Sequence, residues 1–277
     1  MTDSHANDPA LREAEDAGKK LVEDWWVAYN AVDGPAHRAL LGFPLASFGG
    51  ARPGRDNLAV RVQPDSSAWT DEGALHRDEG WDHSIILHQD ARQTTPEKTH
   101  TLTEFTRNRA DGSAYGLVKS RLSVGIKRDG EWRIRVLSSG GLRNPESPDE
   151  PNDAELMAKA KSVVEQVVAA INAGDIEGLR SLCHFPVVRI AGTDLHAIET
   201  PADLSIPDGG VRAEISRIEP LPPQAGDKVV VDIDIRRFAP DGQQLEPEGA
   251  ICLVTRQGED DWGLQFSSTR AGLSGLI

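Results

Sequence analysis

An internal repeat constrains this chain more than any other feature of its sequence. Residues 26–50 and 168–192 match without a gap, and every matching pair lies 142 positions apart. The pairs that carry the same residue include Asn30 and Asn172, Asp33 and Asp175, Leu40 and Leu182, and Phe43-Pro44 and Phe185-Pro186. A fixed spacing over such a stretch is typical of a duplicated unit. The fold must therefore be one that half of this chain can adopt.

The match continues toward the end of each copy at a spacing of 130 residues. Lys98 matches Lys228, Asp111-Gly112 matches Asp241-Gly242, and Trp132 matches Trp262. The second copy is thus shorter by 142 − 130 = 12 residues in the region after its Phe-Pro pair. A unit of about 130 residues is near the usual size of a domain and far longer than a solenoid repeat of about 20–50 residues. We predict two tandem domains.

Charge and hydropathy exclude several classes of function. The net charge of −14 and the pI near 5.0 argue against a nucleic-acid partner, which needs a basic face. The polar, acidic start of the chain does not have the pattern of a signal peptide, and no run of 18 apolar residues is present. We therefore expect a cytoplasmic protein without membrane contact. Cys183 and Cys252 each lie in an apolar run and are predicted to be buried thiols rather than a disulfide framework.

The first half predicts helices followed by strands. Residues 1–10 are expected to be a disordered tail, and an amphipathic helix starts at Leu11 and ends near Asn30. A short helix over residues 36–41 leads through Phe43-Pro44 into a strand. Residues 49–80 are irregular, with a few helical residues expected around 71–77. Four strands follow, predicted at residues 81–88, 99–107, 115–127 and 132–138, and Asp-Gly turns separate the last three.

A segment rich in proline and acidic residues separates the halves. Residues 143–153 contain three prolines and four acidic side chains, a composition that favours a linker. We therefore place the first domain at residues 11–142 and the second at 154–277. The second half repeats the order with helices over residues 154–171 and up to Cys183, and with strands at residues 187–191, 211–218, 228–238, 249–255 and 262–268. This order predicts an α+β fold.

Both halves resemble the nuclear-transport-factor-2-like superfamily, also called SnoaL-like. The resemblance rests on the helix ending Asn-x-x-Asp, the Phe-Pro pair, the stretch 105–112, and the endings at Trp132 and Trp262. It implies cone-shaped domains in which N-terminal helices pack on a curved antiparallel sheet and enclose an apolar cavity. It also implies an intramolecular pseudo-dimer through the outer sheet faces. The superfamily contains cofactor-independent acid–base enzymes and non-catalytic domains, and fold alone does not choose between them.

Some enzymes of this superfamily pair an aspartate at the end of the first helix with a histidine on a later strand. The matching positions here are Asp33 and, more loosely, His83. A carboxylate that holds an imidazole raises its basicity, as a general base requires. Asp33 is equally explained as the end of a helix, because Asp175 occupies the same place without a histidine partner. At a spacing of 130, His83 matches Ala213, and strand alternation puts His83 on the face of Trp81.

Aromatic residues suggest a larger pocket in the first domain than in the second. The candidate ligand-binding residues are Trp26, Tyr29, Trp69 and Trp81, together with His184 of the second domain. His184 could line a pocket or hydrogen-bond a local carbonyl. The histidines lack metal-ligand spacing, no Cys-x-x-Cys occurs, and no glycine loop for phosphate is present, so we expect neither a metal nor a cofactor.

Two functions remain open at this point. The first domain could be a lyase, isomerase, cyclase or hydrolase acting on a small apolar molecule, with the second domain as its structural partner. Alternatively, the chain could be a non-catalytic ligand-binding or scaffold pseudo-dimer. A wide separation of Asp33 and His83, or a cavity filled by Trp26 and Trp81, would exclude the enzyme.

Overall fold

The computed structural model describes residues 8–49, 60–68, 72–139, 153–206, 211–222, 224, 227–258 and 260–270. The chain divides into two compact units, residues 1–148 and 149–277, which we call unit 1 and unit 2. Most of the expected linker, and Trp69, lie outside the described residues. Among the described residues, no helix has both the length and the apolar character needed to cross a membrane.

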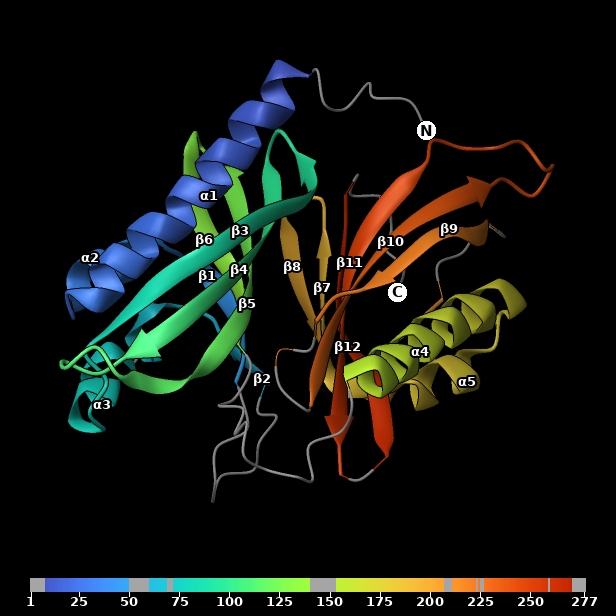
Figure 1. Ribbon diagram of the computed structural model, residues 1–277. Coiled ribbons are helices and arrows are strands. Elements are labelled where there is room, and N and C mark those ends of the chain that lie inside the picture. The colour runs from blue at the N-terminus through green and yellow to red at the C-terminus, as the bar shows by residue number, and fades with distance from the viewer. Residues whose placement is uncertain are drawn as a thin grey trace. The chain divides into compact units, whose positions relative to one another are not determined.

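The two units share one order of elements (Figure 1). Unit 1 contains α1 (Pro9–Asn30), α2 (Gly34–Ala39), β1 (Leu41–Phe48), β2 (Val60–Gln63), α3 (Glu72–Asp78), β3 (His83–Thr95), β4 (Lys98–Asn108), β5 (Ala114–Arg128) and β6 (Glu131–Ser139). Unit 2 contains α4 (Asp153–Ala173), α5 (Ile176–Ser181), β7 (Cys183–Ala191), β8 (Asp194–Ile198), β9 (Arg212–Pro220), β10 (Lys228–Phe238), β11 (Glu248–Gln257) and β12 (Asp261–Thr269). Each unit is thus an α+β domain, as the sequence predicted.

Each unit builds one six-stranded sheet, in the orders β2-β1-β6-β5-β4-β3 and β8-β7-β12-β11-β10-β9. The prediction of wholly antiparallel sheets is wrong at one place in each, because β1 pairs parallel to β6 and β7 pairs parallel to β12. Only strands joined by a tight turn must be antiparallel, and these pairs are distant in sequence. The sequence also missed β2 and β8, short strands that form hairpins with β1 and β7.

The long helix of each unit lies along its sheet, with α1 on β3 and β4 and α4 on β9, β10 and β12 (Figure 1). Asp8 caps α1 by accepting a hydrogen bond from the Ala10 amide at 2.9 Å, and Pro9 occupies the first turn, where its missing N–H costs nothing. Pro9 and Ala10 are therefore helical, whereas the sequence placed them in a disordered tail. Both Phe-Pro bonds, Phe43-Pro44 and Phe185-Pro186, are cis.

An asparagine at the end of each long helix fixes the first long strand. Asn30 donates to the carbonyl of Ser84 and accepts from its amide, both at 2.9 Å, and Asn172 makes the same pair of bonds with Ala213, both at 2.8 Å. Ser84 and Ala213 are thus equivalent. The true spacing here is 213 − 84 = 129, so Arg212, and not Ala213, corresponds to His83.

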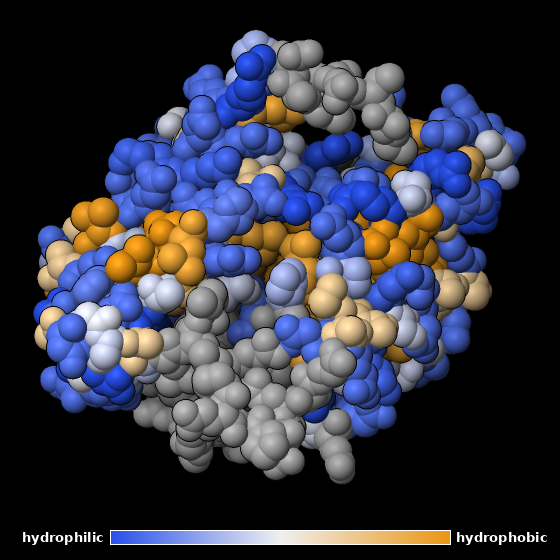
Figure 2. All heavy atoms as spheres, in the orientation of Figure 1, coloured by the Kyte–Doolittle hydropathy of each residue, from blue (hydrophilic) through white to orange (hydrophobic). Residues whose placement is uncertain are grey.

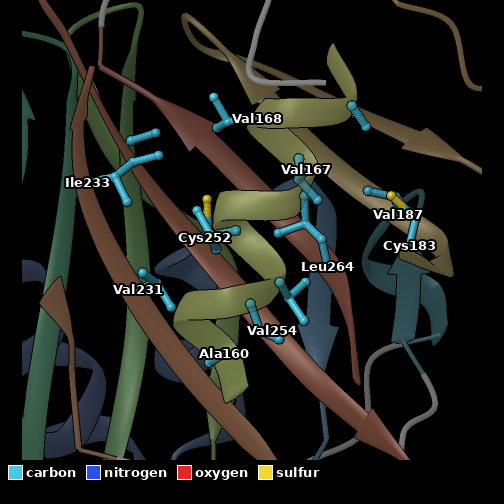
Figure 3. Close-up of a cluster of buried hydrophobic side chains, with 14 of the residues drawn as sticks. Ala160, Val167, Val168, Cys183, Val187, Val231, Ile233, Cys252, Val254 and Leu264 are labelled. Carbon is cyan, nitrogen blue, oxygen red and sulfur yellow. The ribbon is translucent and has the colours of Figure 1, made fainter. Parts of the chain in front are cut away.

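The interior of unit 2 is aliphatic. Figure 3 shows Val167 on α4, which covers a sheet whose inward side chains include Val187, Ile233 and Leu264, and all four are buried. Cys183 and Cys252 are free thiols in this core, which confirms the prediction, and burial raises the pKa of each to about 12. Small and branched apolar side chains fill this cone as an ordinary hydrophobic core.

Candidate functional site

The interior of unit 1 is aromatic. Trp25 stacks on Tyr29 at 4.9 Å between ring centroids, Trp26 lies 4.5 Å from Phe105, and Tyr29 lies 5.0 Å from Trp81. Each of these five side chains is at most 3 % exposed. The structure therefore brings together three of the predicted ligand-binding residues, Trp26, Tyr29 and Trp81, and they pack on one another.

Two charged or titratable groups are buried against these rings. The Arg121 guanidinium lies 4.0 Å from the Trp25 centroid and 4.8 Å from that of Trp26, a cation–π arrangement, while its Nε donates to Ser139 Oγ at 2.8 Å. His37 lies 4.5 Å from the Trp25 ring. Burial, and then the nearby charge of Arg121, lower the pKa of His37 to about 3, so its imidazole is neutral at physiological pH.

A second arginine lies at the Tyr29 hydroxyl. Arg107 is only 6 % exposed, and its Nη2 donates to the Tyr29 hydroxyl at 3.4 Å. Its Nε has no hydrogen-bond partner among the described residues. Trp81 is held beside this pair by a hydrogen bond from its Nε1 to Ser84 Oγ at 3.1 Å, and Ser84 faces Arg107 in the β3–β4 register.

A buried histidine with a carboxylate partner completes the site. His76 of α3 is 5 % exposed, its Nδ1 lies 3.2 Å from Glu79 Oε2, and its ring lies 6.5 Å from that of Tyr29. The Tyr115 hydroxyl donates to the same Glu79 oxygen at 3.0 Å. Sequence reasoning missed this pair, although His-x-x-Glu in a predicted helical segment was a usable signal. We call Tyr29, His76, Glu79, Arg107 and Tyr115 the polar cluster.

The expected pair of Asp33 and His83 is not formed among the described residues. Asp33 caps α2 by accepting from the Ala36 amide at 3.0 Å, and Asp175 caps α5 in the same way from Gly178 at 2.9 Å. His83 instead contacts its neighbour Asp82 at 2.9 Å, with 38 % of its side chain exposed. The expected common face with Trp81 fails because β3 begins only at His83, so strand alternation does not extend back to Trp81.

His184 lies on the opposite face of its sheet from the cone of unit 2, which corrects its expected place in a pocket. Its neighbour Cys183 points into the core, so alternation turns His184 away. The imidazole lies over Gly263 and contacts Thr255 Oγ1 at 2.9 Å and Asp261 Oδ1 at 3.2 Å. Its hydrogen bonds are to these side chains rather than to a local carbonyl.

Two cavities in unit 1 lie outside the aromatic cluster. One of about 450 Å³ is lined by Pro35, Arg38, Ala39, Leu41, Phe43 and Ser66. The other, of about 220 Å³, is lined by Gly42, Phe43, Ile126, Glu131 and the arginines 128, 133 and 135. Neither of these two cavities is lined by Trp26 or Trp81. Within the described part of the chain, no group of three histidine, cysteine or acidic side chains is arranged to hold a metal ion.

No family model and no curated protein matches this chain. Solved structures do match. One is an NTF2-like protein of unknown function from Pseudomonas putida, with 15 % sequence identity, coverage of 42 % of this chain and 86 % of that chain, and a TM-score of 0.36. Another is a candidate ketosteroid isomerase from Shewanella frigidimarina, with 15 % identity, coverage of 41 % of this chain and 96 % of that chain, and a TM-score of 0.35. A third is a candidate dehydratase of the NTF2-like family from Streptomyces avermitilis, with 14 % identity, coverage of 43 % of this chain and 97 % of that chain, and a TM-score of 0.37. The chain is thus similar in fold to NTF2-like proteins, as its sequence predicted, and this similarity assigns no activity to it.

Proposed function

We propose that unit 1 binds a small molecule at the end of its cone where the polar cluster lies, and that unit 2 is its structural counterpart. The supporting observation is that the two units share one order of helices and strands but have different side chains in their interiors. Strand registers and helix positions make the following residues equivalent: Trp25 and Val167, Trp26 and Val168, Tyr29 and Ile171, His37 and Leu179, Phe105 and Ile235, and Arg121 and Ala250.

Stability alone does not account for this difference. Unit 2 shows that aliphatic side chains fill the same scaffold. Burial of a guanidinium or an imidazole carries a desolvation penalty that an aliphatic residue avoids. Such costly groups are typical of binding and catalytic sites. The small apolar molecule expected from the sequence would stack on Tyr29 and Trp81. The predicted pseudo-dimer of the two units stays a prediction.

A second candidate function is proton transfer, and the pairing of His76 with Glu79 favours it. A carboxylate that orients an imidazole is the arrangement of a general base. Tyr29 and Arg107 would then face the negative charge that develops when a proton leaves carbon. Trp26 and Trp81 pack tightly with their neighbours, which meets the condition set above for excluding an Asp33–His83 enzyme in the cone interior. Proton transfer would therefore have to take place at the polar cluster.

Binding is tested by saturation-transfer NMR of the full chain with a set of charged and uncharged monocyclic aromatic compounds. We expect saturable binding of at least one compound, weakened in Tyr29→Ala. Val27→Ala is the matched control on the same helix, because Val27 is 68 % exposed and points away from the cone. Compounds that bind both variants equally, or none that bind, would contradict the proposed site.

Catalysis is tested separately by deuterium exchange in D₂O at the carbon next to the carbonyl of 1-indanone. If His76 is the base, His76→Gln should slow protein-dependent exchange by roughly 100-fold or more, the usual range for loss of a general base. Glu79→Gln should slow it less, because Glu79 only orients the ring. Exchange no faster than in buffer, with binding intact, leaves unit 1 as a binding domain.

A further inference from the structure

The buried charges of the two units differ in sign. Among the described residues, the charged side chains buried in unit 1 are all cations, namely Lys98, Arg107, Arg121 and Arg135. Unit 2 buries one cation, Lys228, together with the carboxylates of Asp232 and Glu248. This excess of buried positive charge occurs in a chain whose net charge is −14. The negative charge of the sequence is thus outside the described interior of unit 1.

One pair of equivalent arginines shows this difference in buried charge at a single position. Arg107 and Arg237 lie 130 positions apart on β4 and β10. Arg237 is paired, since its Nη1 lies 3.3 Å from Glu248 Oε2 and that carboxylate is almost fully buried. Glu248 faces Ile235 in the β10–β11 register. Phe105 is the equivalent of Ile235 in unit 1, and the residue that faces it in the β4–β5 register is Lys119. Unit 1 therefore has a lysine at the position where unit 2 has the carboxylate partner.

From this exchange we propose that the ligand of unit 1 is an anion, specifically a small aromatic carboxylate, and that Arg107 is its charge partner. The inference rests on the proposed binding site. Arg107 is buried, aims its guanidinium at the Tyr29 hydroxyl, and has an Nε without a hydrogen-bond partner among the described residues. A carboxylate takes two parallel N–H bonds from one guanidinium, which is the contact that Glu248 gives to Arg237 in part. The aromatic ring of the ligand would lie against Tyr29 and Trp81.

The experiment compares benzoate with benzamide, which has the same shape and no charge, by calorimetry and tryptophan fluorescence on the full chain. We expect benzoate to bind at least about tenfold more tightly than benzamide, the effect of one charge-assisted hydrogen bond. Arg107→Gln should remove this preference. Lys119→Glu, which copies unit 2, should also abolish benzoate binding but raise the melting temperature, because it puts a carboxylate at the register position of Glu248, which pairs with Arg237 in unit 2.

Lys127→Glu is the matched control, since it makes the same charge change on the same strand away from the site, and it should bind benzoate like the original chain. Equal binding of benzamide and benzoate, or a preference for benzoate that persists in Arg107→Gln, would contradict the proposal that Arg107 binds an anionic ligand. Neither result would contradict the proposed binding site. Failure of both compounds to bind overturns both. Loss of benzoate binding in Lys127→Glu would show an effect of net charge alone and also overturn the role of Arg107.

Discussion

The two units share their framework and differ in what the framework encloses. The asparagine that pairs with the first long strand and the aspartate that caps the short helix recur with equivalent backbone partners and nearly the same distances. The interiors differ in size, polarity and charge. Positions that satisfy backbone groups are restricted by geometry to one or two residue types, whereas positions that fill a cone accept any set of side chains with suitable volume. Equivalence of the framework therefore says little about chemistry.

One difference shows how packing compensates across neighbouring strands. Unit 1 has Gly42 beside Arg133, and unit 2 has His184 beside Gly263, so the small and the large residue have changed places. A Cβ at Gly42 would lie 2.5 Å from Arg135 Cδ and 2.9 Å from Arg133 Cβ, and a Cβ at Gly263 would lie 2.5 Å from the His184 ring. Gly263 is therefore required by His184, whereas Gly42 is crowded by both arginines of β6.

The largest effect is expected from giving unit 1 a residue of the unit 2 core. Trp25→Val copies Val167 and should lower the free energy of unfolding by about 3–4 kcal/mol, through the cavity it leaves and the loss of the ring beneath Arg121. Urea unfolding followed by tryptophan fluorescence measures it. Val27→Ala, at an exposed position, should change the free energy by less than about 0.5 kcal/mol. A loss below about 1 kcal/mol for Trp25→Val would mean that the aromatic cluster is not a tight core.

A double-mutant cycle tests the exchange of small and large residues. Gly263→Arg alone should cost about 2–3 kcal/mol, because the new side chain overlaps the His184 ring. Adding His184→Gly recreates the pair of unit 1 and should recover at least half of that loss in urea unfolding. Additive losses in the double variant would show that the two positions are independent and that the compensation is accidental.

Surface residues mark a further contrast that the sequence did not reveal. The large apolar side chains exposed by the described residues are Val27, Ile85 and Leu87, all in unit 1 on α1 and β3. Figure 2 shows hydrophobic residues gathered at its left, in the region where Figure 1 places α1 and β3. Nothing in the structure shows what covers them, and single apolar residues at a surface are common.

The sequence predicted the elements well because they depend on local signals. Asp-Gly turns, the apolar stripe of residues 21–29 and the Phe-Pro pairs located most strands and helices to within a few residues. The exceptions are β3, which runs to Thr95 and not to His88, and the short strands β2 and β8, which were missed. The site was predicted less well. Asp33 and His83 were chosen by their place along the chain, yet each has a nearer partner. The His76–Glu79 pair lies in the irregular segment, where the two copies of the repeat do not match. The buried position of Arg107 depends on strand register, which the sequence does not give.

The smallest effect, when it is counted per pH unit, comes from one buried group of unit 1. The pKa of His37 is about 3 in the folded chain, below the ordinary value of 6.5, so in this range the unfolded chain binds a proton that the folded chain does not. Stability should therefore fall as pH falls from 6.5 toward 3, by up to about 1.4 kcal/mol per pH unit from this group. His37→Leu copies Leu179 and removes that slope. The burial-lowered pKa of His100, also about 3, affects the original chain and His37→Leu alike, so its effect cancels in the difference between their stabilities.

Above pH 7 the His37 imidazole is neutral in the folded and the unfolded chain, so the difference in stability between the two proteins should be constant there. Parallel stability profiles down to pH 4 would mean that His37 takes up its proton without unfolding, and that the interior of unit 1 is wetter than its packing indicates.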